Sequence, residues 1–289
     1  MADETTVGTD ASASSPDPDD SGRGPRRSRG RKQQTSFLRE LPVLLVIAVV
    51  LALLINTFLV KAFFIPSGSM ERTLHGCTGC SGDRVLVNKV VYRLHDPKPG
   101  DIVVFAGPES WAPEAAVNRP TNPLQRGLQA LASTFGVATP GEKDFVKRVI
   151  AVGGQTVECC DAQGRVTVDK RPLDESYVYV SDPGYEPAPF GPVRVPAGRL
   201  WLMGDHRDQS ADSRSHIADP DQGTIAVDDV IGKAFVIIWP VSRWDTLGTP
   251  ADFGGGSGSG WTVPLLIVLP LLVVGLVAGS VVRRRRRGT

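Results

Sequence analysis

The sequence has no excess of charge of either sign, and this absence removes the usual reason to expect a nucleic-acid partner. It contains 32 lysines and arginines against 31 aspartates and glutamates, a formal net charge of +1. A strongly basic balance would favour binding to phosphate backbones. The charges are nevertheless segregated, because acidic residues crowd the first twenty positions and basic residues crowd 23–32 and 283–287. We therefore predict no nucleic-acid partner.

Cysteine is also sparse, and its spacing argues against a zinc-finger type of site. The four cysteines are Cys77, Cys80, Cys159 and Cys160. The stretch His75-Gly-Cys77-Thr-Gly-Cys80 could bind zinc, but no second pair of cysteines or histidines follows at finger-like spacing. Four cysteines allow three disulfide pairings, and a vicinal Cys159–Cys160 bond would be strained. We favour disulfides or free thiols over a metal site, leave the pairing open, and predict no metal and no cofactor.

Histidine is scarce too, and its four occurrences form no recognisable Ser-His-Asp motif. They stand at positions 75, 95, 206 and 216. Asp205 and His206 are sequence neighbours, and neighbouring side chains of a strand point to opposite faces. A hydrolase built on this chain would then need another base. We assign the histidines to surface or structural positions.

Two apolar runs are long enough for membrane helices, 41–61 and 262–282. About 20 apolar residues, at about 1.5 Å each, cross a hydrocarbon core of about 30 Å. The first run lies too far from Met1 for a cleavable signal peptide, and no small-x-small site directly follows it. Basic residues precede the first run and follow the second, which predicts both termini in the cytoplasm. The sequence thus predicts a two-pass protein of the plasma membrane.

Composition divides the rest of the chain. Residues 1–36 have almost no apolar content and are predicted to be a disordered cytoplasmic tail. Residues 62–250 form the predicted extracytoplasmic domain, with a proline-rich insertion near 107–142. The Gly/Ser-rich residues 251–261 are typical of a flexible linker, and 283–289 form a basic cytoplasmic tail.

The predicted extracytoplasmic domain has the pattern of a β protein. Short β-branched runs alternate with glycine, proline and aspartate, and helical periodicity is scarce. We therefore predict a mainly antiparallel β-sheet domain. The expected strands are Arg84–Asn88, Asp101–Phe105, Val146–Val152, Arg165–Asp169, Arg199–Met203 and Val230–Trp239.

Two serines that flank a glycine, Ser67-Gly68-Ser69, follow closely after the first apolar run. Glycine permits the backbone angles and close approach that an exposed nucleophile often needs. By itself, however, the motif is more typical of a plain juxtamembrane loop or linker. A serine hydroxyl becomes a useful nucleophile only with a base beside it.

Lysine is the alternative base, and Lys147 is the strongest candidate. A lysine amine, with a reference pKa of about 10.4, can act near neutrality only where burial disfavours its charged form. Lys147 stands within Phe145–Ile150, among strand-forming apolar residues. Lys89, within Val87–Val91, is a weaker competitor, and most other lysines lie among polar or turn residues.

A third polar segment, Gly204–Arg214, follows the predicted strand Arg199–Met203. It combines charges of both signs with two serines. Aspartates and arginines in such a segment could form fixed ion pairs that hold a site rigid. The alternative is a polar surface loop with some salt bridges.

Taken in chain order, these segments resemble bacterial type I signal peptidases, and the similarity runs from Leu41 to Trp239. The resemblance implies a mainly β peptidase domain with an N-terminal and a C-terminal transmembrane helix. The second apolar run fits the variants found in high-GC Gram-positive bacteria. The segments that carry the resemblance are Ser67–Met70 with Thr73-Leu74, Gly82–Lys89, Gly100–Val104, Val146–Ile150 and Gly204–Arg214.

The resemblance also implies a role for each site residue. Ser69 would attack the scissile carbonyl, and Lys147 would take the proton from its hydroxyl and pass it to the leaving amine. The Ser69 amide and the Ser67 hydroxyl would form the oxyanion hole. Ser210 would hydrogen-bond and orient the Lys147 amine. The residues that would brace the site are Asp205, Asp212 and Arg214.

The implied reaction is a Ser/Lys serine endopeptidase reaction that removes signal peptides through an acyl-enzyme. It would act on exported pre-proteins after small-x-small residues, at the outer membrane face. The expected partners are these pre-proteins and the lipid bilayer, with secretion machinery nearby. An extended substrate strand would present alternate side chains to shallow apolar pockets.

The sequence departs from the family pattern at a few positions. Glu71-Arg72 replaces an apolar-proline pair, and Gly153-Gly154-Gln155 stands where a Gly-Asp ending is usual. His206 and Gln209 replace two asparagines. The rival interpretations are another Ser/Lys peptidase, such as a self-cleaving repressor domain, and a non-catalytic membrane protein whose β domain binds exported chains.

Overall fold

The computed structural model describes residues 34–77, 80, 82–112 and 144–253 of the 289-residue chain. Residues 1–33 of the first predicted tail and most of the insertion near 107–142 lie outside these residues. So do the predicted span 262–282 and the basic tail 283–289. Gln34–Ser36, which were also predicted to be disordered, are helical. The chain separates into two compact units, Met1–Leu45 and Val46–Thr289. All strands described below belong to the second unit.

Helix α1 (Gln34–Leu54) contains most of the first apolar run. It continues into one π-helical turn, η1 (Ile55–Leu59), and the chain then becomes strand β1 (Val60–Phe64). No helix among the described residues is both long enough and apolar enough to span a membrane. The predicted boundary at 61 is wrong, because Val60 and Lys61 pair with β2. A continuous apolar run does not reveal by composition where helix gives way to strand.

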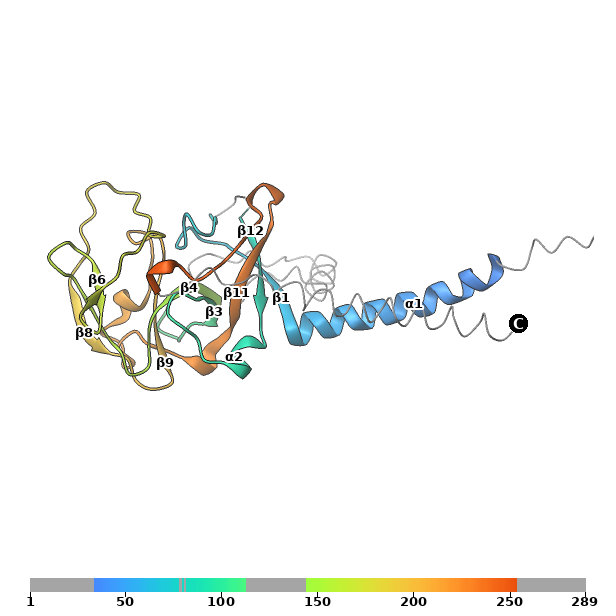
Figure 1. The fold of residues 1–289 in the computed structure, drawn as a ribbon, viewed down its shortest axis with the longest axis horizontal. Coiled ribbons are helices and arrows are strands. Elements are labelled where there is room, and N and C mark those ends of the chain that lie inside the picture. Colours follow the sequence, from blue (N-terminus) through green and yellow to red (C-terminus); the bar gives the residue numbers. More distant parts are fainter. Residues whose placement is uncertain (1–33, 78–79, 81, 113–143, 254–289) are drawn as a thin grey trace, which may run out of the picture. The chain divides into compact units, whose positions relative to one another are not determined.

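The larger of the two sheets is antiparallel throughout and contains eight of the described strands (Figure 1). Its order is β1-β2-β11-β3-β4-β9-β10, and β12 pairs with β11. The prediction of a mainly antiparallel β domain is confirmed. The strands are β1, β2 (Arg84–Asn88), β3 (Ile102–Ala106), β4 (Asp144–Val152), β9 (Arg199–Met203), β10 (Ile225–Ala226), β11 (Val230–Trp239) and β12 (Asp245–Thr246).

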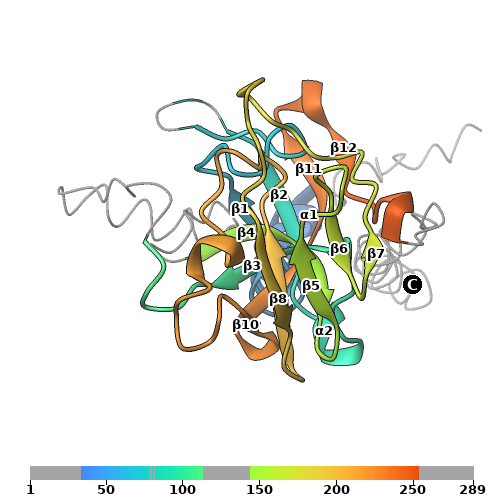
Figure 2. The same ribbon diagram turned by 90° about the vertical axis from the view of Figure 1, so that its left-hand side faces the viewer.

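The smaller sheet has the order β7-β6-β5-β8 among the described residues. Figure 2 faces this sheet, with β5, β6 and β8 in front of the larger one. Only β6 was expected from the sequence, and it is shorter than predicted. The strands are β5 (Thr156–Cys159), β6 (Val166–Val168), β7 (Arg171–Pro172) and β8 (Phe190–Arg194).

Short helical segments connect the strands at several points. The last of them corrects the predicted linker 251–261, because Ala251–Phe253 forms a 3-10 turn and Phe253 packs against the core beside Tyr177. The short segments are α2 (Val91–Leu94) and the 3-10 turns η2 (Ser213–His216), η3 (Val227–Asp229), η4 (Val241–Arg243) and η5 (Ala251–Phe253).

Strand β4 lies between β3 and β9, and seven consecutive residues in it are buried. A strand covered on both faces needs a continuous apolar run rather than an alternating one. Its apolar residues contribute to all three core clusters, through Val146, Val149 and Ile150. The two charged residues at its centre, Lys147 and Arg148, are therefore buried among apolar groups. This burial is the structural origin of the site.

Two disulfides are present, Cys77–Cys80 and Cys159–Cys160. They settle the pairing that the sequence left open. His75, Cys77 and Cys80 nevertheless place one possible ligand atom each within 4.8 Å of one another. A disulfide sulfur is not the thiolate that zinc binds, so a metal there would require a reduced pair.

Candidate active site

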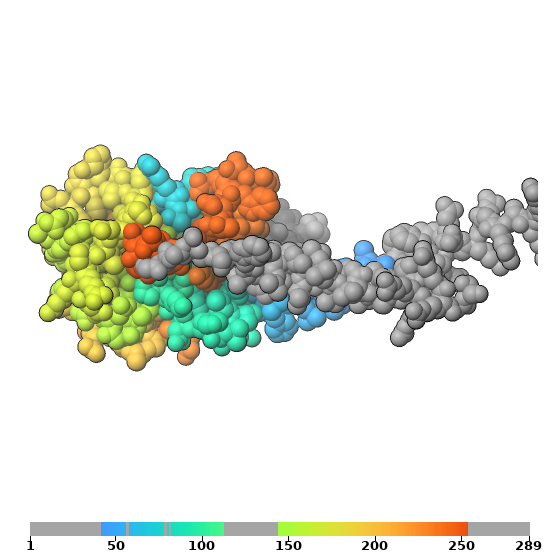
Figure 3. Space-filling model, in the orientation of Figure 1, coloured from blue at the N-terminus to red at the C-terminus, as the bar shows by residue number. Residues whose placement is uncertain are grey.

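The segment after β1 forms a tight turn around Ser69. Ile65 before it and Met70 after it are buried in the core, which fixes both ends of the turn. Within it, the Glu71 amide donates to the Gly68 carbonyl at 3.1 Å. In Figure 3, part of the cyan segment between β1 and β2 reaches the surface between yellow and orange regions of the domain. Ser69 itself is only 4% exposed.

Strand β4 brings Lys147 to this serine. The Lys147 Nζ atom lies 2.7 Å from Ser69 Oγ, and the lysine side chain is fully buried. Lys147 pairs in register with Val103 on β3, so strand geometry rather than a flexible loop sets its position. A serine hydroxyl at hydrogen-bond distance from a buried amine has the arrangement of a nucleophile and its base. The structure thus brings together the two residues that the sequence predicted as catalytic.

Ser67 lies on the same turn. Its Oγ is 3.2 Å from Ser69 Oγ, and either atom can donate. A hydroxyl in this position can donate to an oxygen held close to Ser69. The arrangement is compatible with the predicted oxyanion-hole role of Ser67.

Ser210 does not make the predicted hydrogen bond to Lys147. Its buried Oγ has no hydrogen-bond partner in the described part of the chain. Its side chain instead packs against the Cα of Gly204, where a Cβ would overlap Ser210 and the Ser69 carbonyl oxygen. The absence of a side chain at Gly204 makes this packing possible, and it directs Ser210 onto the loop backbone.

Asp205, predicted as a bracing residue, is fully buried and pairs with Arg148. The Arg148 guanidinium donates to both carboxylate oxygens, at 2.8 and 2.6 Å, and its remaining nitrogen donates to Gly100 O at 2.9 Å. Thr73 Oγ1 also donates to Asp205, at 2.6 Å. Asp205 thus connects β4 to the segment that carries Ser69. No sequence pattern was used to assign a role to Arg148, although its place beside Lys147 in an apolar strand was a usable signal.

Asp212 and Arg214 form a second pair in the same loop. Arg214 donates twice to the carboxylate, at 2.8 and 2.7 Å, and Gly204 N donates at 2.9 Å. Burial alone would raise the pKa of Asp212, but the hydrogen bonds from Arg214 and Gly204 and the charge of Arg214 hold it below its ordinary value. The carboxylate is therefore ionised and contributes negative charge beside the Lys147 amine.

Arg207, in the same loop, forms a third ion pair with Glu175. Arg207 donates through both terminal nitrogens to the two oxygens of Glu175, at 2.6 and 2.5 Å. Burial would lower the pKa of Arg207, and the bonds to Glu175 more than reverse this. No pattern in the sequence marked Glu175, which lies in a stretch without regular structure. Three ion pairs thus fix the loop Gly204–Arg214, which agrees with the ion-pair interpretation of this segment rather than with the surface-loop alternative.

Lys89, His206 and His216, the alternative bases, make contacts other than a hydrogen bond to Ser69. Lys89 follows β2, where burial and the charges of Lys61 and Arg93 lower its pKa. His216 stacks on Trp111, with ring centres 4.6 Å apart. His206 is buried and contacts the carbonyl of Gly68 rather than a serine hydroxyl.

Two cavities adjoin Ser69 on different sides. One is a small apolar space of about 10 Å³ whose lining includes Phe63, Ile65 and Val146. The other is an open hollow of about 450 Å³ whose lining includes His206 and Gln209. Ser67 and Ser69 contribute to both. The serine therefore borders both a small, more enclosed space and a larger, open one.

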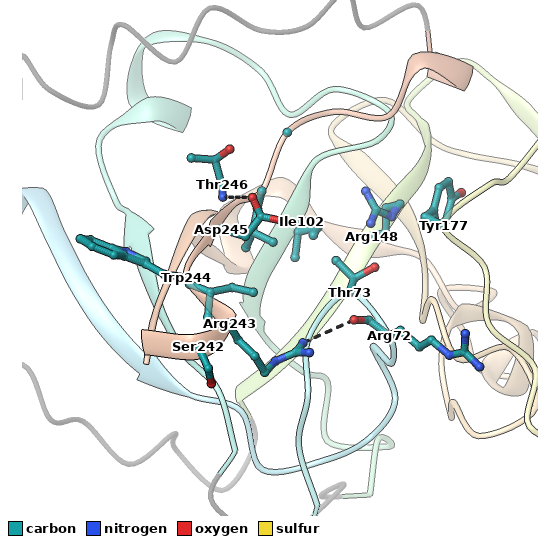
Figure 4. A pocket seen from close by; sticks show the side chains of 13 residues that line it. Arg72, Thr73, Ile102, Arg148, Tyr177, Ser242, Arg243, Trp244, Asp245 and Thr246 are labelled. Atoms are coloured by element: carbon teal, nitrogen blue, oxygen red, sulfur yellow. Dashed lines mark hydrogen bonds between the residues drawn. The ribbon is translucent and has the colours of Figure 1, made fainter. Parts of the chain in front are cut away.

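A third cavity, of about 460 Å³, is lined by neither Ser69 nor Lys147. Figure 4 shows the Arg243 side chain reaching from η4 toward Arg72, to whose carbonyl it donates at 3.4 Å. Arg243 also pairs with the buried Asp83, at 2.9 Å. These contacts attach the segment that follows Ser69 to the end of β11.

Comparison with known proteins places this chain in a recognised family. The family model described as "Signal peptidase, peptidase S26" matches residues 38–239. The chain is 48% identical over 243 residues to a signal peptidase I of Mycobacterium tuberculosis, covering 79% of this chain and 82% of that protein. It is 46% identical over 236 residues to a probable signal peptidase I of Mycobacterium leprae, with coverages of 75% and 81%. Signal peptidase I T of Bacillus subtilis is 30% identical over 218 residues, with coverages of 73% and 91%.

Proposed function

The chain belongs to the family of signal peptidases, peptidase S26, serine endopeptidases that remove signal peptides from exported pre-proteins, and on this premise we propose which of its residues perform the cleavage. Ser69 is the nucleophile and Lys147 is the general base. The observation that carries this assignment is the 2.7 Å distance between Lys147 Nζ and Ser69 Oγ at a buried position.

The first step forms an acyl-enzyme. The neutral Lys147 amine takes the proton of the Ser69 hydroxyl while Ser69 Oγ adds to the scissile carbonyl. The Lys147 ammonium then gives this proton to the departing amine of the mature protein, and the peptide C–N bond breaks. The signal peptide remains attached to Ser69 as an ester. In the second step Lys147 activates water in the same way, and hydrolysis of the ester regenerates both groups.

The carbonyl oxygen becomes negatively charged in both steps. We assign its stabilisation to the Ser69 backbone N–H and the Ser67 hydroxyl, which lies 3.2 Å from the nucleophile. The pairs Arg148–Asp205 and Arg214–Asp212 are bracing contacts that fix the loop Gly204–Arg214. Ser210 contributes through its packing on Gly204.

The small apolar cavity beside Ser69 supports a preference for small residues before the cut. A space of about 10 Å³, roughly that of one water-sized probe, admits a methyl group and little more. We therefore propose cleavage after small-x-small sequences, with the residue before the cut directed into this space. Larger side chains would have to displace Phe63 or Ile65, which the core holds in place.

We further propose that the apolar residues 41–59 and 262–282 anchor the chain in the plasma membrane, with both termini in the cytoplasm. The support is the apolar sequence of both runs and the arginines that flank them. The catalytic domain then lies outside, beside the bilayer and the secretion machinery that delivers pre-proteins. Ser69 stands ten residues after Leu59, where η1 ends, so it stays near the point where a signal peptide leaves the membrane.

The catalytic assignment is tested on purified full-length protein in detergent, with a peptide that contains Ala-x-Ala. Ser69→Ala should abolish cleavage, and Lys147→Ala should lower kcat by at least about 10²–10⁴-fold, the usual contribution of a general base. Lys89→Ala is the matched control and should cleave at close to the wild-type rate. Cleavage by the Ser69→Ala protein at the wild-type rate would refute the assignment.

A further inference from the structure

His206 is a buried histidine that contacts the turn carrying the nucleophile. It is 8% exposed and lies just after β9, in the loop that Arg148 and Arg214 brace. Its imidazole does not hydrogen-bond to either serine hydroxyl of the dyad turn. Its contacts are instead with the backbone on both sides of Ser69. The inference drawn from them rests on the proposed function.

The first contact fixes the peptide unit that precedes Ser69. His206 Nδ1 lies 2.8 Å from the Gly68 carbonyl oxygen. A carbonyl oxygen only accepts hydrogen bonds, so Nδ1 carries a proton and donates it. The Glu71 amide donates to the same oxygen at 3.1 Å. Two donors from different directions therefore hold the Gly68 carbonyl in one orientation.

This peptide unit is the one that contains the proposed oxyanion donor. The Gly68 C=O and the Ser69 N–H belong to the same planar group and point in opposite directions. Whatever fixes the carbonyl direction also fixes the direction of the N–H. A hydrogen bond to the carbonyl also polarises the group and strengthens its N–H as a donor.

The second contact holds the other side of the nucleophile. The His206 backbone N–H donates to the Ser69 carbonyl oxygen at 3.1 Å. One residue thus contacts the carbonyls of both peptide units that flank the Ser69 Cα. A rotation of the Ser69 backbone would break at least one of these two bonds.

The His206 imidazole ring is itself fixed by neighbouring side chains. The Tyr179 ring packs against it with centres 4.7 Å apart, and Tyr179 N donates to Asp205 O at 2.8 Å. His206 Nε2 lies 3.3 Å from Asp208 Oδ1, an ion-pair distance without the alignment of a hydrogen bond. Burial would raise the pKa of Asp208, but hydrogen bonds from Ser181 to its carboxylate hold that pKa far below the ordinary range, so the carboxylate is ionised. The imidazole is fixed between this carboxylate and the Gly68 carbonyl.

We propose that His206 is a positioning residue that orients the Gly68–Ser69 peptide unit, so that the Ser69 N–H points at the developing oxyanion. It touches neither the scissile bond nor the Lys147 amine. Its effect appears in the transition state, where the oxyanion carries charge, and much less in the binding of the uncleaved peptide.

Three variants of the full-length protein test this in detergent. His206→Phe keeps a ring against Tyr179 but cannot donate to Gly68. His206→Asn keeps a side-chain N–H donor on a shorter side chain. His95→Phe is the matched control, because His95 is exposed and remote from the dyad in sequence. The measured quantities are kcat and KM for an Ala-x-Ala peptide, the thermal unfolding midpoint, and inhibition by a peptide aldehyde and the corresponding peptide alcohol.

We expect His206→Phe to lower kcat by roughly tenfold to a hundredfold, since loss of an entire oxyanion donor costs about 10²–10³. KM should change by less than about threefold. Inhibition by the aldehyde, which Ser69 would convert to a hemiacetal with an oxyanion, should weaken as much as kcat falls. Inhibition by the alcohol should not change. His206→Asn should recover most of kcat, and His95→Phe should match the wild type.

Several results would overturn the inference. They are wild-type kcat in His206→Phe, a loss confined to KM, or equal weakening of the aldehyde and the alcohol. If His206→Phe does not fold, kcat is compared between His206→Ala and His206→Asn. Equal kcat in these two variants would also overturn the inference, because only asparagine keeps a side-chain donor. Failure of the proposed function is distinguishable, because Ser69→Ala would then cleave at the wild-type rate whatever residue stood at 206.

Discussion

Arg148 and Asp205 are two buried charges that meet through two hydrogen bonds, with the guanidinium stacked 4.1 Å above the Tyr177 ring. Neither side chain is more than 2% exposed. A buried pair of this kind adds little to stability compared with apolar residues, but removal of one partner leaves the other charged in an apolar environment. The pair therefore matters through its geometry, because it fixes Asp205 and Thr73 relative to β4.

Removal of one partner of the Arg148–Asp205 pair should therefore destabilise the protein. Asp205→Ala should destabilise the folded protein by about 3–5 kcal/mol, because Arg148 is then a buried charge without its carboxylate. The Arg148→Ala, Asp205→Ala double variant should lose less than the sum of the two single variants. The measurement is denaturant unfolding of the full-length protein in detergent.

The control for this prediction is Asp221→Ala. Asp221 is 56% exposed and pairs with Arg199 at 3.0 Å near the surface. An exposed pair contributes about 0–1 kcal/mol, so the control should unfold close to the wild-type midpoint. Additive losses in the Arg148, Asp205 double variant would contradict the proposed coupling.

The loop Gly204–Arg214 depends on close packing at its first residue. A Cβ at position 204 would overlap the Ser210 side chain and the Ser69 carbonyl oxygen. The Ser69 carbonyl belongs to the backbone of the turn and cannot move independently of the nucleophile. The lack of a side chain at Gly204 therefore lets the loop lie directly against the turn that carries Ser69.

Gly204→Ala should accordingly lower kcat by about tenfold or more, because displacements of about 1 Å in a catalytic group can cost about a hundredfold. Adding Ser210→Gly removes one of the two overlaps and should restore only part of the activity. Gly248→Ala is the matched control, since no atom lies within 4 Å of the position that a Cβ would take there. The measurement is kcat for peptide cleavage by the three variants. Unchanged kcat in Gly204→Ala would contradict the prediction, because it would show that the loop has room to move.

Individual strands differ in how well the sequence predicted them, and the reasons are physical. Strands β2, β9 and β11 have the predicted bounds, because turn residues enclose β-branched runs there. Strand β1 was missed, because its residues continue an apolar run that also fits a helix. Strand β5 was missed because its four residues are too few for a pattern, and β8 was missed because it contains Gly191-Pro192, a pair typical of turns.

The candidate site was predictable only in part, because local sequence patterns indicate burial but not which distant residues meet. The apolar neighbours of Lys147 indicated its burial, but only the family resemblance joined it to Ser69, 78 residues away. The Arg148–Asp205 pair spans 57 residues and the Arg207–Glu175 pair spans 32. Such contacts depend on sheet order and loop path, which local patterns do not encode. The predicted Ser210–Lys147 bond is absent among the described residues, and Ser210 lies against Gly204 instead.

For the complete chain, the arrangement across the membrane makes a separate prediction. A phosphatase that is active only outside the cytoplasm should be active when fused after residue 253 and inactive when fused after Thr289. The reason is that the apolar run 262–282 would return the chain to the cytoplasm, where the arginines at 283–287 remain. The measurement is phosphatase activity in intact cells, with immunoblots to equalise expression.

A fluorescent protein that matures only in the cytoplasm provides the reciprocal control. It should fluoresce when fused after Thr289 and stay dark when fused after residue 253. Phosphatase activity in the fusion after Thr289 would contradict the two-pass arrangement and place that end outside.

The central place of β4 has a consequence for how activity is lost. Its backbone amides bond to β3 on one side and β9 on the other, and its side chains are covered on both faces. Hydrogen exchange at such amides requires opening of the whole sheet rather than local fraying. Since Lys147 resides on this strand, deuterium uptake at β4 and loss of peptidase activity should follow the same curve as denaturant is added. The enzyme would then pass from fully active to unfolded without a partly active form between them.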